Sequence, residues 1–366
     1  MTARQTFFQK SFKVLHGSGL SRLLAPFTQG CGAIFMMHHV RADQERSFRP
    51  NQHLEITPEF LRECVDRIRR NGYEILAMDE AVDLLKSGYG RKRYAVLTFD
   101  DGYRDNLEVA YPVLKELGAP FTIYVATGLI DRQSDLWWIA LEHMIAANDE
   151  LVLSEDGSGT GISCRTLQEK NACYHQLTQW LTHEVGELEQ RQIIQRLAER
   201  YDFDLAALVD RLMMTWDDLR QLASEPLVTL GAHTHGHHAL ARLSEEDARK
   251  DIMTGVYRMQ AELGRKPKHF AYPYGNQVAV SERDARLLAD IGFNSAVTTF
   301  PGVLKSVNAR SPMLLPRVSL NGRFQDAYVI DQYLTGAPFA LYRAACWARG
   351  GFGLRTGVSR LFPSTR

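Results

Sequence analysis

Short apolar runs rich in β-branched and aromatic residues alternate along this chain with amphipathic helical stretches. The alternation predicts a largely parallel α/β architecture, because parallel strands need a crossover, usually a helix, between them. The runs with strand character are residues 33–37, 73–76, 94–100, 120–127, 228–234, 269–274, 294–299 and 314–320. Helices are expected between them, and one example begins at Pro58, after the capping residue Thr57, and ends at Asn71–Gly72.

Residues 135–214 break this rhythm, since they show mostly helical patterns around a polar loop, SEDGSGTGIS. We interpret them as a helical insertion in an α/β body of residues 33–334. Residues 1–32 are expected to form an N-terminal helical segment. Residues 335–366 are a basic tail, with five arginines and no acid after Tyr342. Such a tail is either a plain surface segment or a docking element for a membrane surface or a protein.

Composition limits the binding partners and the cellular compartment that we expect for this protein. The formal net charge is zero, from 43 basic and 43 acidic side chains, so the chain lacks the global field that attracts nucleic acid. Its five cysteines are odd in number and form no C-x-x-C pair, which favours a reducing compartment over a disulfide framework. The first thirty residues contain no apolar run long enough for a signal peptide or a membrane span. A cytoplasmic protein is therefore expected, with membrane association through the tail as a further option.

The strongest local signal is the run Thr98-Phe99-Asp100-Asp101-Gly102. Its two acids come at the end of an apolar strand, where parallel α/β folds build their sites. Because unpaired carboxylates are costly to bury, one explanation is a functional partner for them. The other explanation is that both acids cap the helix that follows.

Four histidines in six residues follow the strand expected at 228–234, namely His233, His235, His237 and His238. His233 and His237 are four residues apart, and they share a face if the chain turns helical there. On an extended strand His233 would pair with His235 instead. A solvated histidine cluster is the third interpretation. An aspartate with two of these histidines makes a mixed N/O ligand set with open positions, as a catalytic zinc ion requires, and the neighbouring acid is then a natural general base.

These motifs resemble those of the polysaccharide deacetylases (carbohydrate esterase family 4, the NodB-homology group), whose hallmarks are T-F-D-D-G and G-x-H-[ST]-x-x-H-x-x-L. The second motif stands here as G-A-H-T-H-G-H-H-A-L at residues 231–240. The family's third motif, R-x-P-Y-G in many members, appears as A-Y-P-Y-G at residues 271–275. The resemblance runs from about residue 35 to residue 321, apart from the insertion.

The resemblance implies a distorted (β/α) barrel and a metal-dependent hydrolase that removes N-acetyl groups from an N-acetylated sugar polymer, oligosaccharide or lipid-linked sugar. One divalent ion, zinc with cobalt or nickel as alternatives, would be held by Asp101, His233 and His237. Asp100 would take the proton from the attacking water. The backbone N–H of Tyr274 would help to stabilise the tetrahedral oxyanion.

Two departures from the family's pattern concern catalysis. The arginine of the third motif is replaced by Ala271, and Arg317 on a neighbouring expected strand is the candidate replacement. No L-x-H motif, which carries the general acid in many members, stands near the C-terminus. The subgroup with A-Y-P-Y-G begins with a strand whose histidine faces the site, which makes His38 the candidate acid here; a structural hydrogen bond is its alternative role.

Two other functions stay open. A polynuclear phosphoesterase or amidohydrolase would use His233 and His235 as an H-x-H pair, although His269 is the only histidine beyond His238. A non-catalytic sugar-binding relative would keep the fold without turnover. For three aromatic residues, the sequence allows either stacking against a sugar or packing in the core: Tyr103, Trp137 and Trp138.

Overall fold

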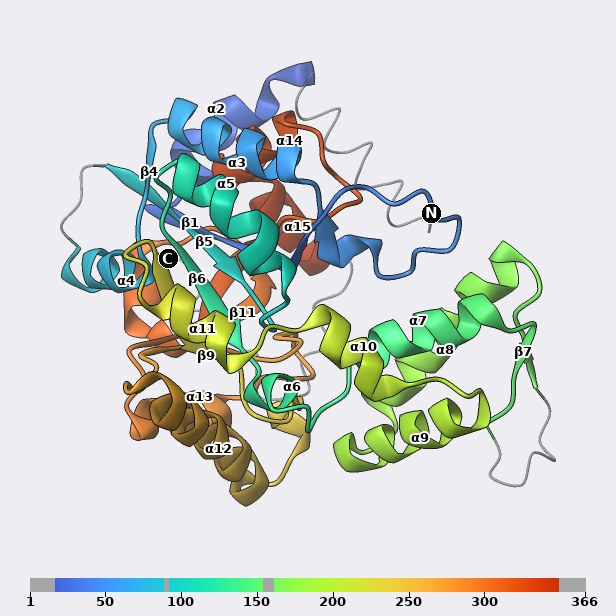
Figure 1. The fold of residues 1–366 in the computed structure, drawn as a ribbon. Helices are drawn as coiled ribbons and strands as arrows, with labels where there is room; N and C mark the ends of the chain where they lie inside the picture. Colours follow the sequence, from blue (N-terminus) through green and yellow to red (C-terminus); the bar gives the residue numbers. More distant parts are fainter. Residues whose placement is uncertain (1–16, 89–91, 154–160, 349–366) are drawn as a thin grey trace.

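The computed structural model describes residues 17–88, 92–153 and 161–348, and Figure 1 shows its fold. Seven parallel strands close into a barrel, because β1 pairs with β12 on one side and with β5 on the other. In their order around the barrel the strands are β1 (Gly32–Met37), β12 (Leu315–Ser319), β11 (Ser295–Pro301), β10 (His269–Ala271), β9 (Val228–Ala232), β6 (Phe121–Val125) and β5 (Arg93–Phe99). The expectation of a (β/α) barrel is therefore confirmed.

The barrel is distorted in two places. The short strand β4 (Tyr73–Ile75) pairs with the first half of β5, outside the closed ring, while β6 pairs with the second half. Between β11 and β12 the register shifts between Val297 and Pro301. The barrel strands are buried along nearly their whole length, because helices cover the outer face and side chains fill the interior.

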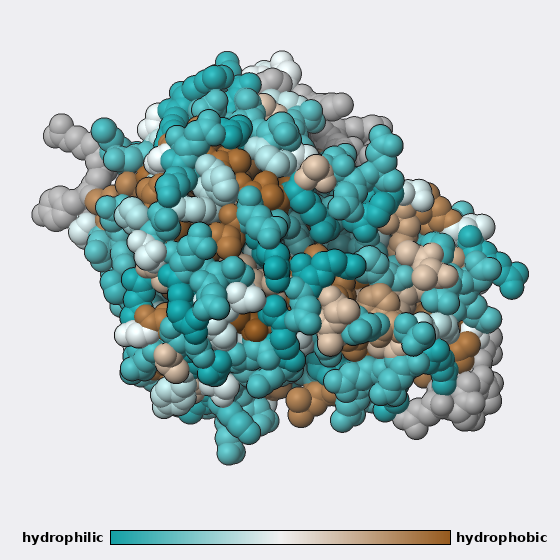
Figure 2. All heavy atoms as spheres, in the orientation of Figure 1, coloured by the Kyte–Doolittle hydropathy of each residue, from teal (hydrophilic) through white to brown (hydrophobic). Residues whose placement is uncertain are grey.

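Helices follow the strands and cover the outer surface of the barrel (Figure 1). Their bounds are α3 (Pro58–Arg70), α4 (Met78–Ser87), α5 (Tyr111–Glu116), α6 (Thr127–Ile130), α11 (Trp216–Ala223), α12 (Glu245–Leu263) and α13 (Glu282–Ile291). α3 begins as expected, since the Thr57 hydroxyl accepts a hydrogen bond of 3.2 Å from the backbone N–H of Phe60. Figure 2 shows this face of the molecule as largely hydrophilic, which fits helices whose apolar sides face inward.

One helix has an irregular start. Residues Asn106–Ala110 form a π-helical turn directly before α5 begins. Pro112 has no N–H to donate to the preceding turn, and this disfavours a regular α-helix at that point.

Four helices and a short hairpin form the insertion between α6 and α11. They are α7 (Trp137–Ala147), β7 (Glu150–Leu151), β8 (Ile162–Ser163), α8 (Leu167–His183), α9 (Glu187–Arg200) and α10 (Leu205–Leu212). Figure 1 shows these helices as a lobe beside the barrel. Their buried side chains belong to the same apolar core as those of the barrel, so the lobe is anchored to it.

The two ends of the described chain pack together. α2 (Leu20–Thr28) lies against α15 (Ala337–Ala348), which follows α14 (Tyr328–Leu334). Residues 1–16 of the expected N-terminal segment and residues 349–366 of the expected tail lie outside the described residues. Within the described ranges no helix is both long and apolar enough to span a membrane.

Candidate active site

The residues singled out from the sequence meet at the carboxyl ends of the barrel strands. Asp100 and Asp101 follow β5, His233 follows β9, His38 follows β1, and Arg317 lies on β12. Because the strands are parallel, these ends share one rim of the barrel.

Asp101, His233 and His237 converge on one point. Asp101 Oδ1 lies 3.3 Å from His233 Nε2 and 3.2 Å from His237 Nε2, and all three side chains are buried. Their three ligand atoms lie within 4.8 Å of one another, and Asp101 Oδ1 has no hydrogen-bond donor among the described residues. A buried carboxylate oxygen facing two imidazole nitrogens is the donor set that a divalent ion such as zinc takes, so these residues fit a metal ion.

The protonation states of this trio bear on metal binding. The Nδ1 of His233 lies 2.7 Å from the carbonyl oxygen of Ala271, and a hydrogen bond from Nδ1–H to that carbonyl leaves the Nε2 lone pair free. Burial lowers the pKa of His237 to about 4, so its ring is neutral near pH 7. Burial raises the pKa of Asp101, but the two imidazoles oppose this effect, and its pKa lies well below the usual range. Burial lowers the pKa of His233, but Asp101 and Asp100 outweigh this effect, and its pKa is higher than usual. Only the neutral imidazole binds a cation, so a metal ion competes with a proton for His233.

Backbone strain gathers at this rim. Six non-glycine residues in the described ranges have a positive φ, and four of them lie in the loops of the site: Asp101, Thr234, His237 and Tyr274. Such conformations cost about 1–3 kcal/mol each, and they persist where the surroundings hold them for a function.

Asp100 points to a different partner from its neighbour. Arg317 donates two hydrogen bonds to the Asp100 carboxylate, from Nη1 to Oδ1 at 2.7 Å and from Nη2 to Oδ2 at 2.6 Å. The guanidinium is fully buried, and its Nε donates to the carbonyl of Thr298 at 2.9 Å. Burial raises the pKa of Asp100, but Arg317 outweighs burial, and the pKa of Asp100 is lower than usual. Asp100 is therefore ionised at neutral pH.

His38 lies beside this pair. Its Nε2 is 4.0 Å from Asp100 Oδ2, too far for a hydrogen bond, and the side chain lines the same pocket. Burial lowers the pKa of His38, while the charges of Asp101 and Asp100 oppose this effect. The next residue, His39, is buried and contacts a different acid, with Nδ1 2.6 Å from Asp105 Oδ2.

The remaining histidines turn away from the trio. His235 Nδ1 lies 3.0 Å from the Thr127 hydroxyl, and His238 Nδ1 lies 3.2 Å from Asp251 Oδ2. Within the described part of the chain, the only group of three or more such side chains close enough to share an ion is the Asp101 trio. The H-x-H arrangement of a polynuclear site is therefore not formed by His233 and His235.

A pocket of about 460 Å³ opens above the trio, and the barrel and the insertion build its two sides. From the insertion it is lined by Trp137, Trp138, Tyr174, Thr178, Gln179, Thr182, His183 and Glu187. The indole N–H of Trp137 donates to the Tyr274 hydroxyl at 2.8 Å, which joins the two sides. Tyr103 does not line the pocket; it is buried, and its ring is tilted by 31° against that of His39 with centroids 3.6 Å apart.

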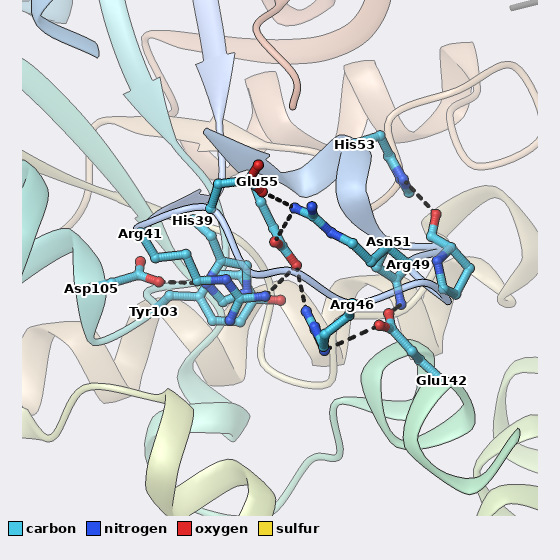
Figure 3. Close-up of polar contacts among 12 residues, drawn as sticks. His39, Arg41, Arg46, Arg49, Asn51, His53, Glu55, Tyr103, Asp105 and Glu142 are labelled. Atoms are coloured by element: carbon cyan, nitrogen blue, oxygen red, sulfur yellow. Dashed lines mark hydrogen bonds and ion pairs between the residues drawn. The ribbon is translucent and has the colours of Figure 1, made fainter. Parts of the chain in front are cut away.

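An ionic network fastens the insertion to the barrel beside this pocket. Figure 3 shows Arg46 between Glu55 of β3 (Glu55–Ile56) and Glu142 of α7, at 3.4 Å from each. Arg41 and Arg49 also contact Glu55. The three arginines are paired with carboxylates. We therefore interpret this network as a structural brace between the insertion and the barrel, and not as a site for an anion.

Asn51 completes the brace. Its side-chain amide donates to the carbonyl of Trp138 and to Glu142 Oε2, both at 2.9 Å, and its oxygen accepts from the Tyr174 hydroxyl at 2.8 Å. Because Trp138 and Tyr174 line the pocket, Asn51 sets the position of the insertion's side of it.

Two residues of the insertion contact residues 234–239, the candidate metal-binding loop, and nothing in the sequence pointed to them. Arg191 Nη2 donates to the carbonyls of Gly236 and His237 at 3.2 and 3.1 Å. One helical turn earlier on α9, buried Glu187 accepts a hydrogen bond of 3.1 Å from the backbone N–H of Ala239. Their spacing of four residues places both on one face of α9, yet many helices carry a glutamate and an arginine at that spacing.

Comparison with known proteins agrees with this geometry. The family model described as polysaccharide deacetylase matches residues 87–295. The putative polysaccharide deacetylase YxkH of Bacillus subtilis (strain 168) is 43% identical over 56 residues, a match that covers 15% of this chain and only 20% of the relative.

Solved structures resemble the fold. The deacetylase PplD of Streptococcus pyogenes, in complex with acetate, superposes with a TM-score of 0.54 at 17% identity, covering 82% of this chain and 97% of the other. For IcaB from Ammonifex degensii the TM-score is 0.52 at 16% identity, with 84% and 97% covered. At this identity the likeness establishes the shared barrel. With the family model matching more than half of the sequence, the chain belongs to the polysaccharide deacetylase family.

Proposed function

We propose that this chain is a metal-dependent hydrolase that removes N-acetyl groups from an N-acetylated sugar polymer, oligosaccharide or lipid-linked sugar. The observation that carries the proposal is the juxtaposition of two different acid sites on neighbouring residues. Asp101 faces two imidazole nitrogens, whereas Asp100 is held ionised by Arg317. A cation site beside a poised base is what amide hydrolysis requires.

Asp101, His233 and His237 would hold one divalent ion, zinc with cobalt or nickel as alternatives, and this ion would polarise the acetyl carbonyl and lower the pKa of water. Asp100 accepts a proton from the attacking water, whose oxygen forms a bond to the acetyl carbon. The backbone N–H of Tyr274 binds the carbonyl oxygen as negative charge develops on it. These roles are proposals from motif position and geometry.

The C–N bond then breaks, and the products are acetate and the free amino sugar. His38 delivers a proton to the departing nitrogen, which its place in the pocket beside Asp100 supports. Arg317 touches no substrate in this scheme; it is a positioning residue that orients Asp100 and keeps it charged.

The pocket supports a carbohydrate ligand. Trp137 and Trp138 line it with apolar rings, the surfaces on which sugars stack, and Gln179, Thr182 and His183 of α8 add polar groups. Nucleic acid is not an expected partner, because the chain has no net positive charge. A cytoplasmic location is supported by the free thiols at Cys31, Cys64, Cys164 and Cys173.

Acetate release tests the proposal. The substrates are N-acetylglucosamine oligomers, polymers and lipid-linked sugars, each with and without chelator and with added Zn²⁺, Co²⁺ or Ni²⁺. The matched control is Asp100→Asn, which keeps the shape of the side chain but cannot take a proton. Metal-dependent release by the wild type and none by Asp100→Asn is expected. A folded, metal-loaded wild type that binds these sugars without releasing acetate would be the non-catalytic relative instead.

A further inference from the structure

An apolar stripe runs along the outer side of α2. Leu20, Leu23 and Phe27 recur at spacings of three and four residues, so they lie on one side of the helix. Leu23 is 72% exposed and Phe27 is 83% exposed. Side chains of this size normally face a core, and a run of them facing outward marks an interaction surface.

The neighbouring helix carries another exposed apolar side chain. α15 lies against α2, and the Thr28 hydroxyl donates to the carbonyl of Thr335 at 2.7 Å just before α15 begins. Leu341 of α15 is exposed as well. Eight large apolar side chains are exposed in the described part of the chain, and half of them belong to these two helices. We call Leu20, Leu23, Phe27 and Leu341, with the exposed Arg22 and Arg343, the α2–α15 face.

The sequence around this face has an unusual charge. Residues 1–32 contain four basic and no acidic side chains, and residues 332–366 contain five basic and no acidic ones. The whole chain has a net charge of zero, so the remaining residues carry nine more acidic than basic side chains. The net charge is thus positive in the two terminal segments and negative in the residues between them. Of these nine basic residues the structure describes Arg22 on α2 and Arg343 on α15, two helices that pack together.

We propose that the α2–α15 face docks on the surface of a lipid bilayer that contains anionic lipids. Exposed leucine and phenylalanine beside basic residues is the pattern of a helix that lies in the membrane interface. With nine residues, α2 is about 13 Å long, enough to lie in the interface and far too short to cross the bilayer. The acidic remainder of the chain is repelled by the same lipids, so the charge separation also orients the protein on the membrane.

Other occupants fit this face less well. Two copies meeting through it would bring the positively charged terminal segments of both together, which electrostatic repulsion opposes. Nucleic acid would match the charge but would leave the leucine and phenylalanine side chains without apolar contacts. The inference rests on this face alone and does not depend on the proposed deacetylation.

The test is co-sedimentation of the full chain with vesicles, either of phosphatidylcholine alone or of phosphatidylcholine with phosphatidylglycerol. The wild type is expected to sediment with the anionic vesicles, weakly with the neutral ones, and less as salt rises. The double variant Leu23→Gln/Phe27→Gln should bind at least about tenfold more weakly, since it removes the inserted apolar groups. Arg22→Glu/Arg343→Glu should weaken binding to the anionic vesicles alone.

Leu188→Gln is the matched control, because Leu188 is an exposed leucine on α9, away from α2 and α15. It should bind vesicles like the wild type. Equal binding to neutral vesicles, no binding to either, or unchanged binding by the double variant would each overturn the proposal. A double variant that melts well below Leu188→Gln would show a face covered by the chain itself, and a dimer that the double variant abolishes would show a second copy; both results would also overturn it.

Discussion

The Arg317 guanidinium donates two hydrogen bonds, of 2.7 and 2.6 Å, to the two oxygens of the Asp100 carboxylate, although the two residues are far apart in the sequence. Closure of the barrel brings them together, because β12 and β5 both pair with β1. A two-pronged contact of this kind fixes the carboxylate's orientation as well as its charge.

The pH dependence of catalysis should report this contact. Asp100 acts as a base only when ionised, so activity falls as the pH drops through its pKa. Burial raises that pKa and Arg317 lowers it by more. Arg317→Ala therefore raises the pKa and moves the acidic limb of kcat/KM toward neutral pH, while Arg317→Lys restores only part of the wild-type behaviour. An unchanged acidic limb in a folded, metal-loaded Arg317→Ala protein would remove Arg317 from this role.

Metal retention should separate neighbouring histidines. His237→Ala removes one of three ligands and is expected to abolish most of the metal affinity. His238→Ala is the matched control. His238 is the next residue in the sequence, but it pairs with Asp251 and not with Asp101. It should retain metal near the wild-type level. Elemental analysis of both purified variants decides the matter, and normal metal in His237→Ala would refute the assignment.

The adjacent histidines at the end of β1 should fail in different ways. His38→Ala is expected to lower kcat by about 100-fold, the usual scale for a lost general acid, with the melting temperature nearly unchanged. His39→Ala should instead lower the stability by about 1–3 kcal/mol, because it removes a buried ring and the contact of that ring with Asp105 Oδ2. Thermal melting and steady-state kinetics on both variants test this. A kinetic defect confined to His39→Ala would reverse the two roles.

Arg191 should act on the metal site from the insertion. It binds the carbonyl of His237, whose φ of 54° is strained for a residue with a side chain, so its loss should loosen the loop. Arg191→Ala is expected to lower metal affinity by about 10- to 100-fold, the range for groups that orient metal ligands. Arg191→Lys should recover part of the loss.

Arg200→Ala provides the control for Arg191. Arg200 lies on the same helix and also donates to a carbonyl, that of Val152, but far from the metal-binding loop. Competition with a chelator measures the metal affinity of each variant directly. Equal affinities for Arg191→Ala and Arg200→Ala would mean that α9 only packs against the loop.

The strand ends of the site could be predicted from the sequence because local rules suffice there. Asp100, Asp101 and His233 each follow an apolar run, and the carboxyl ends of parallel strands meet at one rim. The choice of His237 over His235 depended on whether the chain turns after β9. The loop does turn, with Thr234 and His237 in the left-handed region of φ. The residue types in the loop do not predict these backbone conformations.

Other features depend on packing between distant elements. The burial of His39 depends on Tyr103 and Asp105 lying against it. Glu187 and Arg191 belong to an ordinary polar helix pattern, and their contacts with the metal-binding loop exist only because the insertion docks beside the pocket. A sequence pattern carries no information about that docking.

Titration of the metal-free protein with zinc, followed by acetate release at each step, tests the central claim most directly. One ion held by Asp101, His233 and His237 predicts that the rate rises in proportion to added zinc and levels off at one equivalent per chain. Acetate release that persists in chelator, or that needs a second equivalent, would contradict a single metal centre as the seat of hydrolysis.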